Sequence, residues 1–155
     1  MRRKDRELAS KEELLSILEE ADVCRIAIKT GKAPYIVPLN YGYLWSNHLV
    51  LYFHSAGEGR KIDLLQKNAI VGFEIDTAHE LVQDEQACNW GMKYKSIIGT
   101  GNVVFIEDEN EKALALQVIM KKYGFPGHPE FNAAMLQKTK VYKLIVEEAS
   151  GKQKK

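Results

Sequence analysis

The chain has 155 residues with 22 basic and 21 acidic side chains, a net charge of +1 and a hydrophobic fraction of 45%. This length is typical of one domain with one sizeable core. The near equality of basic and acidic residues argues against a dedicated nucleic-acid-binding protein, which normally has a strong basic excess. No apolar run approaches the length needed to span a bilayer. We therefore expect a single globular domain over residues 1–155, with a core over about 11–148, that binds neither nucleic acid nor membrane.

The chain ends and the two cysteines indicate the compartment in which we expect the protein to function. The first residues are charged with no apolar stretch behind them, which is not a secretory signal. Cys24 and Cys88 lack metal-type spacing, so we expect no disulfide framework and a reducing cytoplasm. The basic residues of 1–4 and 152–155 are interpreted as solvated termini.

The chain begins with a helix and then changes to strand periodicity. Ser10 and Glu13 form a capping box ahead of an apolar helical face. Alternating and β-branched patterns then predict six strands, over residues 23–29, 34–43, 48–54, 71–76, 97–107 and 141–147. Further helices are predicted over residues 60–67, 108–123 and 130–137.

Hairpin-like strand pairs dominate this order, and the helices are too few for regular βαβ alternation. The pattern predicts a mainly β, antiparallel barrel or sandwich with peripheral helices. A doubly wound parallel sheet is excluded.

The most informative stretch runs from His54 to Asp63, where a strand ends, a Gly-rich loop follows and a helix begins. Arg60 and Lys61 stand in the first helical turn, against the usual preference for acidic residues there. A bound phosphate would account for them, because helix N–H groups, a guanidinium, an ammonium and the Ser55 hydroxyl can act together. The alternative is a solvated helix start with both cations in water.

Two other stretches are candidates for contact with a planar ring. Pro38 removes one backbone donor and predicts an edge or bulge, beside Asn40 and Tyr41, whose backbone groups can then bond a ring's polar edge. In residues 87–96, aromatic, sulfur and cationic side chains precede a strand. Trp90 can either pack against a bound ring or cover one end of the barrel as a structural residue.

The histidines do not predict a metal site. His48, His54, His79 and His128 lie in different elements without partners at ligand spacing. His54 ends a strand beside the phosphate loop and is either structural or functional.

In these stretches the sequence resembles the pyridoxamine 5′-phosphate oxidase-like FMN-binding split barrels, in particular their nitroimidazole-resistance (Nim) branch. The resemblance covers roughly residues 11–148 and rests on the order of short motifs. These motifs are Val37-Pro38-Leu39-Asn40-Tyr41-Gly42, Tyr52-Phe53-His54-Ser55-Ala56, Gly59-Arg60-Lys61, Cys88 with Trp90, Tyr94-x-Ser96 and Gly99-Thr100-Gly101.

The resemblance implies a six-stranded antiparallel Greek-key split barrel, and a homodimer with FMN at the subunit interface. Residues of the first motif, Val37, Pro38, Leu39, Asn40 and Tyr41, would lie along the isoalloxazine. The ribityl phosphate would be held by His54, Ser55, Arg60 and Lys61, and the remaining wall would come from Trp90, Tyr94 and Ser96, from either subunit. The C-terminal Arg-x-His pattern of the oxidases proper is replaced by Tyr142-Lys143-Leu144, which argues against a vitamin B6 phosphate as substrate.

Two functions remain open at this point. The first is a flavin-dependent oxidoreductase, similar to nitroreductases, that passes electrons from a nicotinamide cofactor to small aromatic or nitro compounds. Its acid–base residues are unknown, with Tyr41 and His54 as the weak candidates. The second is a non-catalytic cofactor-binding or haem-binding module, in which a histidine ligates iron.

Overall fold

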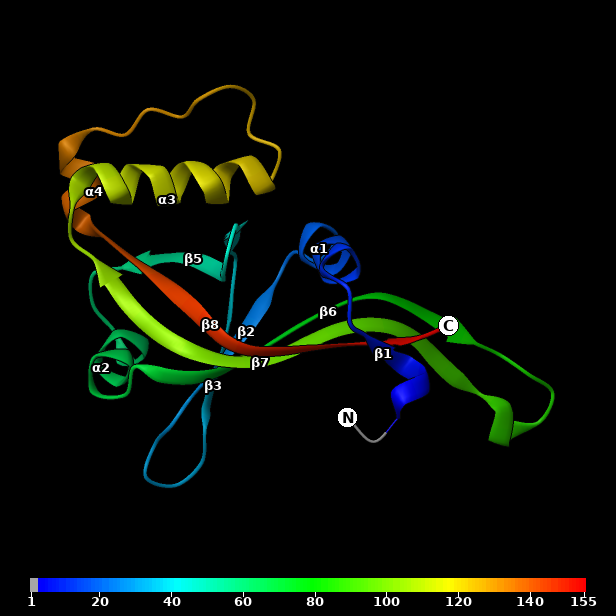
Figure 1. The fold of residues 1–155 in the computed structure, drawn as a ribbon. Helices are drawn as coiled ribbons and strands as arrows, with labels where there is room; N and C mark the ends of the chain where they lie inside the picture. Colours follow the sequence, from blue (N-terminus) through cyan, green and yellow to red (C-terminus); the bar gives the residue numbers. More distant parts are fainter. Residues whose placement is uncertain (1–2) are drawn as a thin grey trace.

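A computed structural model describes residues 3–155 and consists mainly of one antiparallel sheet with helices on its faces (Figure 1). Of the N-terminal residues 1–4, Met1 and Arg2 lie outside the described part. The strands are β1 (Glu7–Leu8), β2 (Cys24–Ile28), β3 (Tyr35–Leu39), β4 (Gly42–Trp45), β5 (Leu49–Ala56), β6 (Ile70–Val82), β7 (Gly91–Ile106) and β8 (Thr139–Lys154). The helices are α1 (Lys11–Glu20), α2 (Arg60–Lys67), α3 (Glu109–Lys122) and α4 (Ala133–Lys138), with single turns η1 (Lys4–Arg6) and η2 (Ala87–Asn89).

The helix starts follow the predicted local chemistry. The Glu13 N–H donates to Ser10 Oγ (3.2 Å), and the Ser10 N–H donates to the Glu13 carboxylate (3.1 Å). Asp108 accepts from the Glu111 N–H (2.9 Å) and caps α3 in the same way. The capping box and both helix starts are therefore confirmed.

The sheet has the strand order β3-β2-β6-β7-β8-β5-β4, with β1 paired to β8. All of these pairings are antiparallel. The sheet therefore has eight strands instead of the predicted six, because one predicted strand is broken in two and β1 is added.

The break falls at Asn40-Tyr41, within the predicted strand over residues 34–43. The Tyr41 hydroxyl donates to the carbonyls of Leu18 (2.9 Å) and Ala21 (3.2 Å), which draws this side chain into the core under α1. β3 pairs with β2, whereas β4 pairs with β5. Leu39 and Gly42 are at most about 11 Å apart, so the sheet curls until its two end strands are close.

Three strands also run further than the sequence pattern predicted. β6 and β7 continue past residues 76 and 97 into a long two-stranded arm closed by η2, which projects from the body beside β8 (Figure 1). β8 continues to Lys154, where it pairs with β7 and β1, and Gly151 is buried. The interpretation of residues 152–155 as a solvated terminus is thus wrong for Lys152–Lys154, because backbone pairing holds them in a strand.

The core lies on the concave side of the sheet, where α1 adds Leu14, Ile17 and Leu18. A second cluster lies under α3 and α4 and includes Ile119 and Leu136. No helix within residues 3–155 is long and apolar enough to cross a membrane.

Tyr142 is an exception among the buried polar groups. Its ring lies between Phe53 and Phe105, each 5.6 Å away between centroids, and burial raises the pKa of its hydroxyl. That hydroxyl has no hydrogen-bond partner among the described residues, and the nearby Ser55 hydroxyl donates to the Ala56 carbonyl (3.0 Å). An unpaired buried hydroxyl destabilises the folded state.

We expect Tyr142→Phe to raise the free energy of unfolding by about 1 kcal/mol, because it removes a group that is desolvated without compensation. Tyr41→Phe is the matched comparison, and it should lower that free energy by a similar amount because its hydroxyl is paired with two carbonyls. Urea unfolding of the three proteins measures both effects. Destabilisation by Tyr142→Phe would mean that the hydroxyl is bonded after all.

Candidate functional site

The predicted phosphate loop joins β5 to α2 and is shaped by glycine. Gly59 has a φ of +133°, a conformation that other residues rarely adopt, and no side chain caps the helix start. The carbonyl of Gly59 accepts from the N–H groups of Ile62 (2.8 Å) and Asp63 (3.2 Å). The N–H groups of Arg60 and Lys61 begin the helix ahead of these bonds, as an anion site at a helix start requires.

The two cations of this helix start have different surroundings. The Arg60 guanidinium lies 4.7 Å from the centre of the Tyr35 ring, which connects α2 to β3 by a cation–π contact. Lys61 is half-buried, and burial lowers the pKa of its ammonium. Neither cation forms a salt bridge with an acidic side chain of residues 3–155. Their positive charge is therefore uncompensated by the protein.

His54 and Ser55 lie on β5 directly before this loop. His54 is opposite Val141 of β8, and partial burial together with the Lys61 ammonium lowers the pKa of its imidazole. Ser55 is half-buried and its hydroxyl donates to the neighbouring Ala56 carbonyl. The structure thus brings Lys61 near His54, whereas Ser55 points to the opposite face of β5 because successive strand residues alternate.

The coupling between Lys61 and His54 has a measurable consequence. Lys61→Met should raise the pKa of His54 toward its ordinary value, because a nearby like charge disfavours the imidazolium. In the parent protein the folded-state pKa lies below the unfolded one, so stability falls as the pH drops below about 6.5. An NMR titration of His54 measures this pKa. Lys67→Met, at the other end of α2, is the control, and equal shifts in both variants would contradict the coupling.

The β3 segment, which was predicted to lie along a bound ring, has the predicted edge position. Val37 is half-buried, Pro38 is exposed and Leu39 is buried. Because β3 ends the strand order, Pro38 lies on an edge strand, as its missing donor predicted. The Asn40 side chain donates to the Asp22 carbonyl (3.3 Å).

Tyr41 does not have the predicted surroundings. It is fully buried, its hydroxyl is bonded in the core, and burial raises its pKa. Its N–H, expected to be free for a ring's polar edge, donates to the Tyr123 hydroxyl (3.1 Å). The interpretation of Tyr41 as an acid–base residue is therefore abandoned.

The remaining predicted residues lie on the arm, away from the phosphate loop. Trp90 is half exposed and its Nε1–H donates to the Asp84 carbonyl (2.6 Å), whereas Tyr94 lies under the Lys152 ammonium, 5.5 Å from the ring centre. Tyr94 precedes Asn102 by eight strand positions, or about 26 Å, and Asn102 pairs with Ile70 just after α2. One chain therefore does not bring Trp90, Tyr94 and Ser96 to Arg60, and Figure 1 shows α2 and the arm at opposite ends.

Sequence reasoning missed two aromatic–cation contacts. Tyr35 lies in the strand predicted over residues 34–43, but nothing local connects it to Arg60. Lys152 was assigned to a solvated tail and instead covers Tyr94. Since both contacts join residues distant in sequence, periodicity carries no signal for them.

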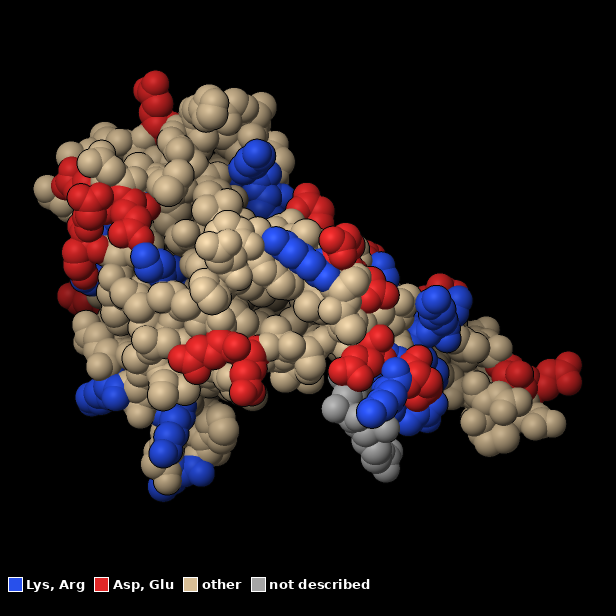
Figure 2. Space-filling model, in the orientation of Figure 1, with Lys and Arg blue, Asp and Glu red and all other residues tan. Residues whose placement is uncertain are grey.

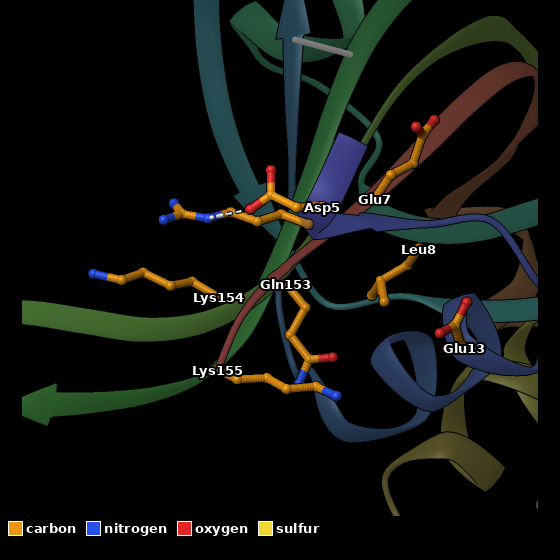
Figure 3. Close-up of a pocket in the computed structure, with 8 residues that line it drawn as sticks. Asp5, Glu7, Leu8, Glu13, Gln153, Lys154 and Lys155 are labelled. Carbon is orange, nitrogen blue, oxygen red and sulfur yellow. Dashed lines mark ion pairs between the residues drawn. The ribbon is translucent and has the colours of Figure 1, made fainter. Parts of the chain in front are cut away.

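A separate hollow of about 400 Å³ lies between β1 and the end of β8, where Asp5, Glu7, Leu8 and Lys154 are among its lining residues (Figure 3). None of the predicted flavin-contacting residues lines it. Within residues 3–155 no cluster of three or more His, Cys, Asp or Glu side chains is arranged to hold a metal ion.

Comparisons with known proteins show the family and the fold of this chain. The family model described as pyridoxamine 5′-phosphate oxidase matches residues 10–153. A candidate 5-nitroimidazole antibiotic resistance protein from Bacteroides thetaiotaomicron is 35% identical, with a TM-score of 0.81 over 95% of this chain and 86% of that one. No curated protein matches the sequence.

Two more distant structures share the fold. An FAD-binding protein from Mesorhizobium loti is 24% identical, with a TM-score of 0.65 over 95% of this chain and 96% of that one. An FAD- and haem-binding protein from Mycobacterium smegmatis is 15% identical, with a TM-score of 0.85 over 97% of this chain and 74% of that one.

Proposed function

The chain belongs to the pyridoxamine 5′-phosphate oxidase family, and from that membership we propose that it is an FMN-binding, flavin-dependent oxidoreductase with nitroreductase-like substrates. The observation that carries the proposal is the pair Arg60 and Lys61, which have no acidic partner, at a glycine-shaped helix start with His54 near Lys61. A phosphate dianion needs several charge-assisted donors before it leaves water, and this loop offers them together.

The side chains and N–H groups at this loop are better suited to FMN, which carries a phosphate, than to a flavin that lacks one. Arg60 supplies a planar donor fork, Lys61 an ammonium, Ser55 a hydroxyl and α2 its first N–H groups. Burial and the Lys61 ammonium lower the pKa of His54, which favours the neutral imidazole, and this form can donate one hydrogen bond without adding charge. The edge strand residues Val37 and Pro38 would then lie along the isoalloxazine.

The proposal extends to the fold and the assembly. We take the curled sheet to be a split barrel with Greek-key order, whose two end strands are linked by Asn40-Tyr41. Because Trp90, Tyr94 and Ser96 are too far from Arg60 in one chain, the second wall of the site would come from the partner in a homodimer. That dimer covers surface left open in one copy.

The flavin, when bound, supplies the redox chemistry, taking electrons from a nicotinamide cofactor and passing them to a small aromatic or nitro compound. The protein's part is to hold the phosphate, orient the ring and exclude water. Oxidation of a vitamin B6 phosphate is not proposed, because the C-terminal Arg-x-His pattern of the oxidases proper is replaced by Tyr142-Lys143-Leu144, and Tyr142 is fully buried. With Tyr41 bonded in the core, His54 is the remaining candidate for proton transfer.

The alternative is a non-catalytic module that binds haem, as does the Mycobacterium smegmatis relative, which binds both FAD and haem. Haem ligation needs an open histidine on an apolar wall. His54 instead lies beside Lys61 and the polar loop, which favours an anionic ligand.

A visible spectrum of the purified protein tests the proposal. Reconstitution with FMN should give paired flavin bands in the blue and near ultraviolet, and NADH or NADPH with a nitroaromatic compound should bleach and restore them. Parallel titrations with FAD and haem distinguish the cofactors. A single intense Soret band with no flavin uptake would overturn the proposal, and flavin uptake without bleaching would reduce it to a binding module.

Trp90 provides an independent test of the second wall. Trp90→Ala should weaken FMN binding by about 1 kcal/mol if the indole packs on the flavin, and FMN should quench the Trp90 fluorescence of the parent apoprotein. Trp45, which lies under the Lys11 ammonium on β4, provides the control variant Trp45→Phe. Unchanged FMN affinity after Trp90→Ala would mean that Trp90 has only a structural role at the end of the arm.

A further inference from the structure

A lysine is buried between α3 and α4 without an acidic partner. Lys112 of α3 is 6% exposed, and its ammonium donates to the Leu136 carbonyl of α4 (3.3 Å). No acidic side chain of residues 3–155 forms a salt bridge with it. A buried charge without a counter-ion is costly to folding, so a role in positioning α4 would explain why a lysine lies here.

The acidic side chains at the start of α3 are engaged elsewhere. Figure 2 shows acidic side chains at the end of the molecule where α3 begins. Asp108 accepts from the Glu111 N–H as the helix cap, and the Glu111 carboxylate accepts from Lys143 of β8 (2.5 Å). The hydrogen bond of the Lys112 ammonium therefore goes to the end of α4 and not to a carboxylate.

Lys112 acts on the last turn of α4, where carbonyl groups have no partner within the helix. The Thr139 N–H and hydroxyl both donate to the Met135 carbonyl, the hydroxyl at 2.9 Å. Lys112 donates to the next carbonyl, that of Leu136, whose side chain is buried in the second cluster. The end of α4 is thus fixed by one residue from α3 and one from β8.

The same end of α4 borders the phosphate loop. Thr139, the residue after α4, pairs with Ala56, the last residue of β5. The loop begins at the next residue, Gly57, and a Cβ added there would lie 3.5 Å from the Lys138 carbonyl oxygen. A displacement of the last turn of α4 would therefore reach the loop directly.

The face of β5 that carries His54 also points toward α4. Tyr52 and Val141 belong to the second cluster, under α3 and α4. His54 follows Tyr52 by two positions and is opposite Val141, so all three share one face. The Lys61 ammonium, which lowers the pKa of His54, is near this face. The end of α4 and the Lys61 side of the phosphate site therefore lie on the same side of β5.

We propose that Lys112 is a positioning residue for the phosphate loop. Its bond to Leu136 fixes the end of α4, and α4 in turn holds the loop in the conformation that receives the phosphate. The identity of the ligand rests on the proposed function, whereas the link from Lys112 to the loop is a property of this chain alone. The two can therefore be tested separately.

Hydrogen exchange of the apoprotein, measured by NMR, tests the link without a ligand. Lys112→Met removes the donor and keeps the size of the side chain, and replacing a buried charge by an apolar group is often neutral for overall stability. The Thr139 amide should exchange about tenfold faster, because the end of α4 loses a bond from a charged donor. The Ile62 and Asp63 amides, which bond to the Gly59 carbonyl of the loop, should exchange about threefold faster or more.

Three further variants make this result decisive. Lys112→Arg retains a charged donor and should restore slow exchange. Lys143→Met is the matched control, because Lys143 joins β8 to α3 without a hydrogen bond to α4, and it should leave the Ile62 amide unchanged. Thr139→Val removes the other side-chain bond to the last turn and tests the same link if Lys112→Met does not fold. An Ile62 amide that does not respond, or that responds equally to Lys143→Met, overturns the proposal.

Flavin titration tests the consequence for binding. Lys112→Met should weaken FMN binding about fivefold or more and riboflavin binding less than about twofold, since only the phosphate contacts the loop. Lys112→Arg should restore FMN binding, whereas a general loss of structure would weaken both ligands alike. Unchanged FMN binding, or equal weakening of both flavins, overturns the positioning role. A parent protein that binds neither flavin overturns the proposed function, and hydrogen exchange then still decides whether Lys112 holds the loop.

Discussion

Arg60→Ala is expected to weaken FMN binding by about 2–5 kcal/mol, more than tenfold, because the phosphate would lose its bidentate donor at a helix start with no acidic neighbour paired to it. Riboflavin has no phosphate, so its weaker binding should change little. Titration of both ligands against both proteins, followed by flavin fluorescence, measures the difference.

Two controls decide how the Arg60 result is interpreted. Lys67→Ala removes a cation from the last turn of α2 and should leave FMN affinity unchanged. Tyr35→Leu removes the ring under the guanidinium and should cost less than Arg60→Ala. Equal weakening of FMN and riboflavin by Arg60→Ala would assign Arg60 to the ring pocket or the fold. No weakening of either would leave both cations as a solvated helix start.

Gly42→Ala is expected to lower the free energy of unfolding by about 1–3 kcal/mol, the usual cost of overpacking. A Cβ at position 42 would lie 2.6 Å from the Ile119 nitrogen and 2.8 Å from the Val118 carbonyl carbon. These are backbone atoms of α3, so the helix would have to move away from β4. The change should appear as a lower midpoint of urea unfolding with an unchanged slope.

Gly31→Ala is the matched control, because nothing lies within 4 Å of a Cβ added there. It should leave stability unchanged or raise it slightly by restricting the unfolded chain. If the two alanine variants unfold at the same urea concentration, close packing of α3 on β4 is not a constraint on the fold.

Several features were predictable because they depend on neighbours in sequence. The capping box of Ser10 and Glu13, the limits of α2 and the edge position of Pro38 follow from local hydrogen bonding and backbone geometry. The same holds for the order of motifs, which led to a family that the comparisons confirm. The assignment of individual residues to the flavin stays a prediction.

Other features depend on contacts that no local pattern encodes. Tyr41 fits the alternating pattern of a strand in the sequence. Its hydroxyl nevertheless donates to the carbonyls of Leu18 and Ala21, outside that strand, and the strand is broken at this residue. Lys152 and Lys154 resemble a solvated tail, but β7 and β1 pair with that segment and hold it in the sheet. Pairing with distant strands overrides weak local preference in such cases.

The sequence by itself determined the antiparallel β class of this protein, the starts of α1 and α3, the limits of α2 and the loop that places Lys61 near His54, because capping, periodicity and glycine geometry act over a few residues. The tertiary structure alone decided that Trp90 and Tyr94 lie on an arm about 26 Å away along the strands, that the Tyr142 hydroxyl is buried without a partner, and that one sheet face exposes Ile36, Ile70 and Ile98. These outcomes follow from the register and curvature of an eight-stranded sheet, which are properties of residue pairs far apart in the chain.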